Sequence, residues 1–412
     1  MTVEPTSKQS RAVRAAGHAR LAGLLGTIIA VGPVSVDMYL PAFGQIGARF
    51  GSGVPQLTLA SYFAGFAVGQ LIQGLLADRF GRRASLAAGL SLYTLTSLAC
   101  AGAQTGIEFC AFRALAAFGA AASVVVPRAM VRDIADGPEA GSLMSDVLLV
   151  MSVAPVVAPV LGSLLLRIAD WRAIFIVAAL YGVACLGLLW RYLPETLAPD
   201  GRSRLGFLEA AQSYGMALRE PRFLVHAAIG SLGMAALFAY LAGAPTVFMT
   251  QYGVSPSGFA TLLALLGLLM IGFFRINGWL VRRRGVSFAL SIGIAGWLSS
   301  GLALCVLARM RATSAAAIFA VLVVFIFGYS FIPSNAQVGA LSRHAAHAAT
   351  VTSLMSTLQY GAGALAGALI GALADGTARP MAAIILGCAV GALLAVCVRL
   401  PADTGGRVTD PA

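Results

Sequence analysis

Long apolar runs separated by short polar segments dominate the chain. A run of about 18 or more apolar residues can cross the hydrocarbon core of a bilayer as a helix. The pattern therefore predicts an all-α polytopic membrane protein. We place its twelve transmembrane helices near residues 21–43, 55–77, 84–104, 107–127, 142–166, 174–192, 222–246, 257–280, 286–307, 314–335, 350–372 and 380–400.

The longest polar interval between two runs covers residues 193–221 and divides the twelve into two sets of six. We expect an N-terminal six-helix bundle over residues 1–192, a cytoplasmic linker over 193–221 and a C-terminal six-helix bundle over 222–412. The first run has a basic flank, as a signal peptide has, but it is longer than the roughly 7–15 residues of a signal sequence. We therefore keep it as the first transmembrane helix.

A weak internal repeat supports this division. The segment GLLADRFGRR (residues 74–83) follows the second run, and NGWLVRRRG (residues 277–285) follows the eighth. Val281 stands where the first copy has Asp78, so the two halves are not functionally equivalent. Two related bundles predict a central cavity, with the substrate near the bilayer midplane and the halves rocking around it.

Composition excludes a soluble enzyme and a disordered chain. Hydrophobic residues make up 59% of the sequence and charged residues 11%, against about 25% charged residues in soluble proteins. The net charge of +12 is spread between apolar runs instead of forming a basic face, so a nucleic-acid partner is not expected. Of the 28 basic residues, only six fall in predicted outer loops. This bias predicts that both termini lie in the cytoplasm.

The sequence has few residues that could bind nucleotides, act as covalent catalysts or hold a metal ion. Lys8 is the only lysine, so no P-loop lysine can bind nucleotide phosphates and no lysine can form a Schiff base. The six cysteines lie in apolar stretches and are read as packing residues. His344 and His347 lack a third ligand for a metal. We expect no catalytic residue, no metal and no cofactor, and the alternative of a membrane-embedded enzyme or sensor has no support.

Asp37 is the one carboxylate well inside a predicted helix, where an ionisable group is costly and marks a functional site. Arg113, in the fourth helix, is predicted to lie at a similar depth. If the two side chains face a common cavity, they can pair directly or through water and allow Asp37 to bind and release a proton. The alternative is a static ion pair that locks two helices. Asp146 is a weaker candidate, better explained by a helix cap or by snorkelling to the interface.

Two further segments have an ordered pattern. The loop between the second and third helices combines an acid, three arginines and glycines, a set whose contacts can form in one conformation and break in another: Gly74, Asp78, Arg79, Gly81, Arg82 and Arg83. The fifth helix has small residues and prolines that permit close helix packing and bending: Ala154, Pro155, Ala158, Pro159 and Gly162.

These residues together resemble the drug:proton antiporters of the major facilitator superfamily, and among them the Bcr/CflA type that confers bicyclomycin and chloramphenicol resistance. The resemblance covers nearly the whole chain. It is carried by residues 37–41 (DMYLP), residues 69–70 before the 74–83 motif, Arg113 with Gly119, residues 154–163, residues 171–175 (WRAIF) and residues 194–196 (PET). Alanine replaces glycine at 154 and 158, and Phe118 replaces the usual glutamine before Gly119.

The resemblance implies the major facilitator fold and proton-coupled efflux of amphiphilic drugs or antibiotics across the bacterial inner membrane by alternating access. It also implies a proton-coupling role for Asp37 and Arg113. We expect a monomer whose partners are a small-molecule substrate, protons and the lipid bilayer. A transporter that exports or imports a small metabolite on the same fold is the alternative. The cavity wall is expected to be apolar and aromatic, with these candidates: Tyr62, Phe66, Phe238, Tyr240, Asn335 and Gln359.

Overall fold

The computed structural model describes residues 7–197, 212, 214–310, 314–341 and 348–397, and every regular element in these ranges is a helix. The first half contains α1 (Ser7–Ile29), α2 (Val31–Asp37), η1 (Leu40–Ala42), α3 (Phe43–Phe50), α4 (Val54–Phe80), α5 (Arg82–Gly102), α6 (Gly106–Ile134), α7 (Gly137–Met151), α8 (Ala154–Ile168) and α9 (Arg172–Tyr192). The second half contains α11 (Pro221–Pro245), η3 (Thr246–Gln251), α12 (Pro256–Arg284), α13 (Val286–Leu307), α14 (Ala315–Ser330), α15 (Pro333–Leu341), α16 (Ala348–Ala372) and α17 (Arg379–Cys397).

The all-α membrane architecture is confirmed. Within the described ranges, ten helical segments are long and apolar enough to cross a bilayer, or eleven if the bent pair Gly17–Ile29 and Val31–Phe50 is one span. The helix α16 occupies the place of the predicted eleventh span but is outside this count, in keeping with its polar residues Ser353, Ser356, Thr357 and Gln359. The exact number of twelve stays a prediction.

Three of the predicted spans are broken, and a proline accounts for each break. Proline has no N–H and its ring clashes with the carbonyl four residues earlier, so a helix bends or ends there. In each broken span, the helix before the proline ends four residues, or in one case three residues, ahead of it. The helix α1 ends at Ile29 before Pro33, α7 at Met151 before Pro155, and α14 at Ser330 before Pro333. The broken spans bring irregular backbone to the middle of the molecule, where the cavity described below lies.

The same left-handed turn ends the second helix of each repeat. Gly81 has φ +96° between α4 and α5, and Gly285 has φ +84° between α12 and α13. A residue with a Cβ adopts such angles at a cost, so glycine is favoured at both turns. The repeat seen in the sequence thus corresponds to two equivalent turns in the fold.

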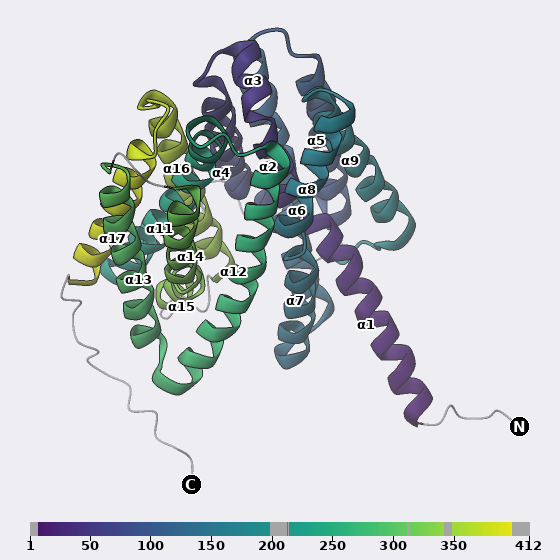
Figure 1. Ribbon diagram of the computed structural model, residues 1–412. Helices are drawn as coiled ribbons and strands as arrows, with labels where there is room; N and C mark the ends of the chain where they lie inside the picture. Colours follow the sequence, from purple (N-terminus) through teal and green to yellow (C-terminus); the bar gives the residue numbers. More distant parts are fainter. Residues whose placement is uncertain (1–6, 198–211, 213, 311–313, 342–347, 398–412) are drawn as a thin grey trace, which may run out of the picture.

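The two halves pack side by side and meet along α4 with α16 and α8 with α12. Figure 1 shows the first turn of α1, the beginning of α7 and the end of α12 at the same end of the molecule. The sequence places all three on the cytoplasmic side; we call this the inner end, and the assignment stays a prediction.

The predicted boundaries of the two bundles and the linker also stay predictions. The last helix of the first half ends at Tyr192 and α11 begins at Pro221. Most of the linker between them lies outside the described residues, as do Lys8's side chain, His344 and His347.

Candidate functional site

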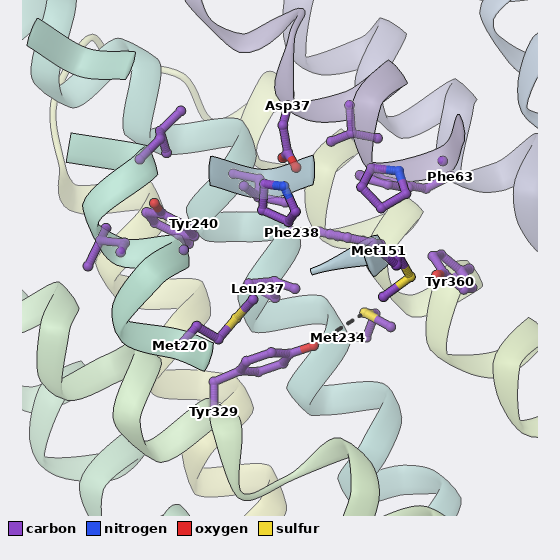
Figure 2. A pocket seen from close by; sticks show the side chains of 18 of the residues that line it. Asp37, Phe63, Met151, Met234, Leu237, Phe238, Tyr240, Met270, Tyr329 and Tyr360 are labelled. Carbon is purple, nitrogen blue, oxygen red and sulfur yellow. Dashed lines mark hydrogen bonds between the residues drawn. The ribbon is translucent and has the colours of Figure 1, made fainter. Parts of the chain in front are cut away.

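A cavity of about 320 Å³ lies between the two halves. Figure 2 shows side chains from both halves around it, with Asp37 pointing into the space and Tyr329 and Met270 on the far side. Its walls are formed by α2, α4, α6, α7 and α8 from the first half and α11, α12, α14 and α16 from the second. The cavity is therefore in the position expected for a substrate site between two repeats.

Four of the six predicted wall residues line this cavity: Tyr62, Phe66, Phe238 and Tyr240. The other two, Asn335 and Gln359, are not among the lining residues of this cavity. The Asn335 side-chain amide instead donates to the Asn277 side-chain oxygen at 2.9 Å and to the Phe331 carbonyl at 2.7 Å. Asn335 thus joins α15 to α12 in the second half.

Sequence reasoning missed a group of methionines and tyrosines in the wall. These residues are Met151, Met234, Met270, Tyr329 and Tyr360. The Tyr329 hydroxyl contacts the Met234 sulfur at 3.9 Å, as drawn in Figure 2. Methionine is flexible and polarizable, so it adapts to ligands of different shapes. Met151 and Tyr329 could have been identified from the sequence, because each lies four residues before a proline that interrupts a predicted helix.

Asp37 contributes the only carboxylate among the described residues that line the cavity. It is partly exposed to that space, and its side chain makes no hydrogen bond or ion pair with any other described residue. Arg128 lines the same cavity but forms no ion pair with Asp37 among the described residues, and most of the wall is apolar. A carboxylate in such a wall, without a paired counterion, is stabilised by taking up a proton or a positively charged group. The geometry is that of a proton-binding site open to the cavity.

Arg113 lies behind this wall, inside the first half, and forms no ion pair with Asp37 among the described residues. Of the two arrangements that the sequence allowed, a direct pair and a pair through water, the direct pair is not formed by the described residues in this conformation. Its guanidinium carbon lies 4.8 Å from the Tyr39 ring centre, 4.3 Å from that of Tyr62 and 5.7 Å from that of Phe175. The positive charge of Arg113 is therefore stabilised by cation–π contacts with three aromatic rings and not by the Asp37 carboxylate.

One polar contact links Arg113 to the helix that carries Asp37. Nη1 of Arg113 donates to the Ser35 carbonyl oxygen at 3.3 Å, while Nε and Nη2 have no partner in the described part of the chain. The Ser35 hydroxyl also hydrogen-bonds the Tyr93 hydroxyl at 2.7 Å. Arg113 and Tyr93 therefore hold α2 from behind, two residues from Asp37.

The loop between α4 and α5 forms an ion-pair network. The Arg82 guanidinium pairs with Asp78, and its Nε donates to Oδ2 of Asp133 at 2.9 Å. Arg82 is buried, so both carboxylates interact with a poorly hydrated charge. Arg79 forms no ion pair within the described ranges, and its guanidinium lies 5.6 Å from the Phe80 ring centre. The predicted role of this loop in conformational change is not tested by the contacts.

The sequence did not identify Asp133 and Glu195 as partners of this loop. The backbone N–H groups of Arg82 and Arg83 donate to the two carboxylate oxygens of Glu195 at 2.9 and 3.1 Å. These are unpaired N–H groups at the start of α5, where a carboxylate is also favoured by the helix dipole. The Thr196 hydroxyl donates to Asp133 at 2.9 Å. The PET segment (residues 194–196) therefore fastens the end of the first half to the loop.

The predicted small-residue helix face is where α8 contacts both α2 and the second half. Ala158 and Gly162 are buried, and Gly162 lies directly against the Met38 backbone. Gly267 of α12 approaches the Pro155 backbone, since a Cβ at Gly267 would lie 3.5 Å from it. The helix breaks before Pro155 and continues through Pro159. This face permits the close approach that the sequence predicted.

Asp146, the weaker candidate, does not face the cavity. Its Oδ2 lies 3.0 Å from Nε2 of His18, so the contact joins α7 to α1. Both side chains are partly exposed, so the pair contributes little stability.

At the end opposite to the inner end, here called the outer end, the halves are closed against each other. The Phe63 and Phe238 rings stack with their centres 3.4 Å apart and their planes 5° from parallel. The Thr246 hydroxyl donates to the Gln56 side-chain oxygen at 3.1 Å, in the orientation that lets the Gln56 amide donate to backbone carbonyls. Closer to the middle of α4 and α16, the Thr357 hydroxyl donates to the Ala67 carbonyl at 3.1 Å and also joins the two halves. The conformation is therefore closed at the outer end.

The profile of the Major Facilitator Superfamily matches residues 24–368. The chain belongs to the Major Facilitator Superfamily. It is 32% identical to the MFS-type transporter YdgK of Bacillus subtilis over 398 residues, which cover 95% of this chain and 96% of that protein. It is 30% identical to a bicyclomycin resistance protein homolog of Haemophilus influenzae over 374 residues, which cover 90% and 94% of the two chains.

A solved structure of this superfamily's fold is also similar. The partially occluded inward-open structure of the xylose transporter XylE of Escherichia coli matches with a TM-score of 0.71 at 16% identity, covering 94% of this chain and 98% of that one. The predicted superfamily fold and the resemblance to bicyclomycin-resistance transporters are confirmed. As a Major Facilitator Superfamily protein, the chain is a membrane transporter and not an enzyme.

No group of three His, Cys, Asp or Glu side chains in the described ranges could hold a metal ion. Among the described residues, the charged groups of the cavity wall are Asp37 and Arg128, and Arg128 follows directly after the predicted helix 107–127. The chemistry available to the cavity is therefore proton binding, charge recognition and apolar contact.

Proposed function

We propose that this transporter exports amphiphilic drugs or antibiotics across the bacterial inner membrane in exchange for protons. The observation that carries the proposal is Asp37, a carboxylate in an aromatic and methionine-rich cavity between the halves that pairs with no described residue. The bicyclomycin-resistance name of the H. influenzae relative supports an antibiotic as substrate.

Asp37 is the proposed proton carrier. When it is ionised, the apolar wall solvates it poorly, so a proton or a bound substrate that shields it lowers the free energy. A proton that reaches Asp37 from the outer side therefore competes with the substrate and favours its release there. The proton gradient drives the cycle, and no cofactor is needed.

Arg113 is proposed to act through α2 and not by direct pairing. It holds the Ser35 carbonyl, and Ser35 and Asp37 belong to the same short helix. A change in the charge of Asp37 that shifts α2 also changes this hydrogen bond and the packing of α2 on α8. Arg113 is in this view a positioning residue of the proton site.

The two halves are proposed to rock about the α8–α12 contact, with Ala154, Pro155, Ala158, Pro159 and Gly162 as the hinge face. The network of the α4–α5 loop would favour the conformation in which the inner ends of α4, α5 and α6 are held together. We further propose that the protein works as a monomer, with both termini in the cytoplasm.

Inverted membrane vesicles from cells that express the full chain provide the test. A proton gradient is imposed, and proton release is followed when bicyclomycin or another uncharged antibiotic is added. We expect drug-dependent release with the wild type, none with Asp37→Asn, and wild-type release with Asp146→Asn, which removes a carboxylate outside the cavity.

Each other outcome has a distinct meaning. Unchanged release with Asp37→Asn would contradict the proton-carrier role, while the export of antibiotics would stand. If no antibiotic causes release with the wild type, the transport of a small metabolite replaces drug export as the proposed function.

A further inference from the structure

A second hollow of about 380 Å³ adjoins the central cavity. It lies between α4, α6 and α7 of the first half and α15 and α16 of the second. Arg128 of α6 lines both spaces, so the two meet at this residue. Because α6 runs from Gly106 at the outer side to Ile134 at the inner side, the second hollow is on the route from the inner end to the cavity.

The second hollow is cationic. Arg128 and Arg132 are its only charged lining residues among those described, and their spacing of four residues places them one helical turn apart. Neither arginine forms a hydrogen bond or an ion pair with any described residue. Asp78 lines the adjoining hollow with Arg132 but is paired with Arg82, and Asp37 lines the central cavity with Arg128 without pairing with it. Two arginines without counterions leave a surplus of positive charge here.

A buried amide adds to this set of donors. Gln70 lines the same hollow, its side chain is buried, and its Nε2 has no hydrogen-bond partner in the described part of the chain. Ser353 and Ser356 of α16 supply hydroxyl groups from the opposite wall. A group that offers several acceptor oxygens and a negative charge would satisfy these donors together.

We propose that Arg128 and Arg132 bind the anionic group of an amphiphilic substrate that enters from the inner end, while its apolar body occupies the aromatic and methionine-lined cavity. The proposal deepens the proposed function, on which it rests, by naming the substrate class: amphiphiles that carry a carboxylate or a similar oxyanion. Cationic amphiphiles are disfavoured because they would have to pass two arginines to reach Asp37.

Three small ligands with one naphthalene body test the charge preference. They are 1-naphthaleneacetic acid, which is anionic at pH 7, its neutral amide 1-naphthaleneacetamide, and the cationic 2-(1-naphthyl)ethylamine. Binding to the purified full chain is measured by calorimetry in an uncharged detergent without anionic lipid, so that lipid headgroups cannot occupy the site. We expect the wild type to bind the acid about tenfold more tightly than the amide, and the amine most weakly.

The variants locate the preference. Arg128→Gln is expected to remove the roughly tenfold advantage of the acid while the affinity for the amide stays within about twofold. Arg128→Lys keeps the positive charge and should retain the preference, so it serves as the test if the glutamine variant fails to fold. The matched control is Arg167→Gln, which removes an exposed arginine at the end of α8 and should also retain the preference. Arg132→Gln should reduce it in part.

The proposal is overturned if the wild type binds the three ligands equally, prefers the amine or does not bind the acid, or if Arg128→Gln keeps the full preference. These failures are separable from a failure of the proposed function. Drug-dependent proton release is measured with uncharged antibiotics and depends on Asp37, so it can succeed while the charge preference is absent.

Discussion

Replacing Gly162 with alanine should disturb the contact between α8 and the segment that follows Asp37. A Cβ at this position overlaps the Met38 carbonyl oxygen and lies 3.0 Å from the Met38 carbonyl carbon and 3.2 Å from its Cα. All three are backbone atoms, so no side-chain rotation relieves the overlap. The two backbones must separate by about 1 Å, and overpacking of this kind costs roughly 1–3 kcal/mol.

Gly187→Ala is the matched control. Gly187 lies inside α9, and a Cβ there meets nothing within 4 Å. Both substitutions gain up to about 1 kcal/mol from the higher helix propensity of alanine, so their difference isolates the steric cost. We expect Gly162→Ala to have a free energy of unfolding lower than that of Gly187→Ala by about 1–3 kcal/mol.

Unfolding by sodium dodecyl sulfate in dodecyl maltoside micelles, followed by circular dichroism, measures this difference. The same two variants are compared for drug-dependent proton release, where only Gly162→Ala should lose activity because it displaces the helix that carries Asp37. If the two variants unfold at the same detergent ratio and transport equally well, the close contact between α8 and Met38 does not exist.

Three further changes follow from the contacts. Gly81→Ala puts a Cβ on a residue with φ +96° and should lower the free energy of unfolding by about 1–2 kcal/mol in the same titration. Asp133→Asn weakens the ion pair at the start of α5 and should cost about 1–2 kcal/mol, whereas Glu139→Gln on the exposed start of α7 should cost nothing measurable. Phe238→Ala removes the stack on Phe63, worth about 0.5–1.5 kcal/mol beyond burial, and should raise hydrogen–deuterium exchange in η3 by opening the outer end.

Each of these has a clear contrary result. A Gly81→Ala variant as stable as the wild type would show that the turn tolerates a Cβ. Equal stability of the Asp133 and Glu139 variants would contradict the ion-pair network. Unchanged exchange in η3 after Phe238→Ala would show that the aromatic stack does not keep the outer end closed.

The sequence predicted the membrane helices, the motif loop and much of the cavity wall, because these depend on local properties. Apolar length predicts a span wherever it occurs, and the glycine at 81 predicts a turn from its own conformational freedom. The proposed wall residues that line the cavity, such as Tyr62 and Phe238, belong to the helices that enclose it. The proline in each broken span was visible too, although the position of the break was not predicted.

The partners of the charged residues were decided by tertiary structure. The sequence gives the depth of a residue along a helix but not the direction in which its side chain points. Successive side chains are rotated by about 100° around the helix axis. In helices that are apolar all round, no polar stripe shows which side faces the cavity. Asp37 and Arg113 therefore share a depth without sharing a space, since one side chain faces the cavity and the other faces three aromatic rings. Arg128 could be placed in the cavity only once the packing of α6 against the second half was known.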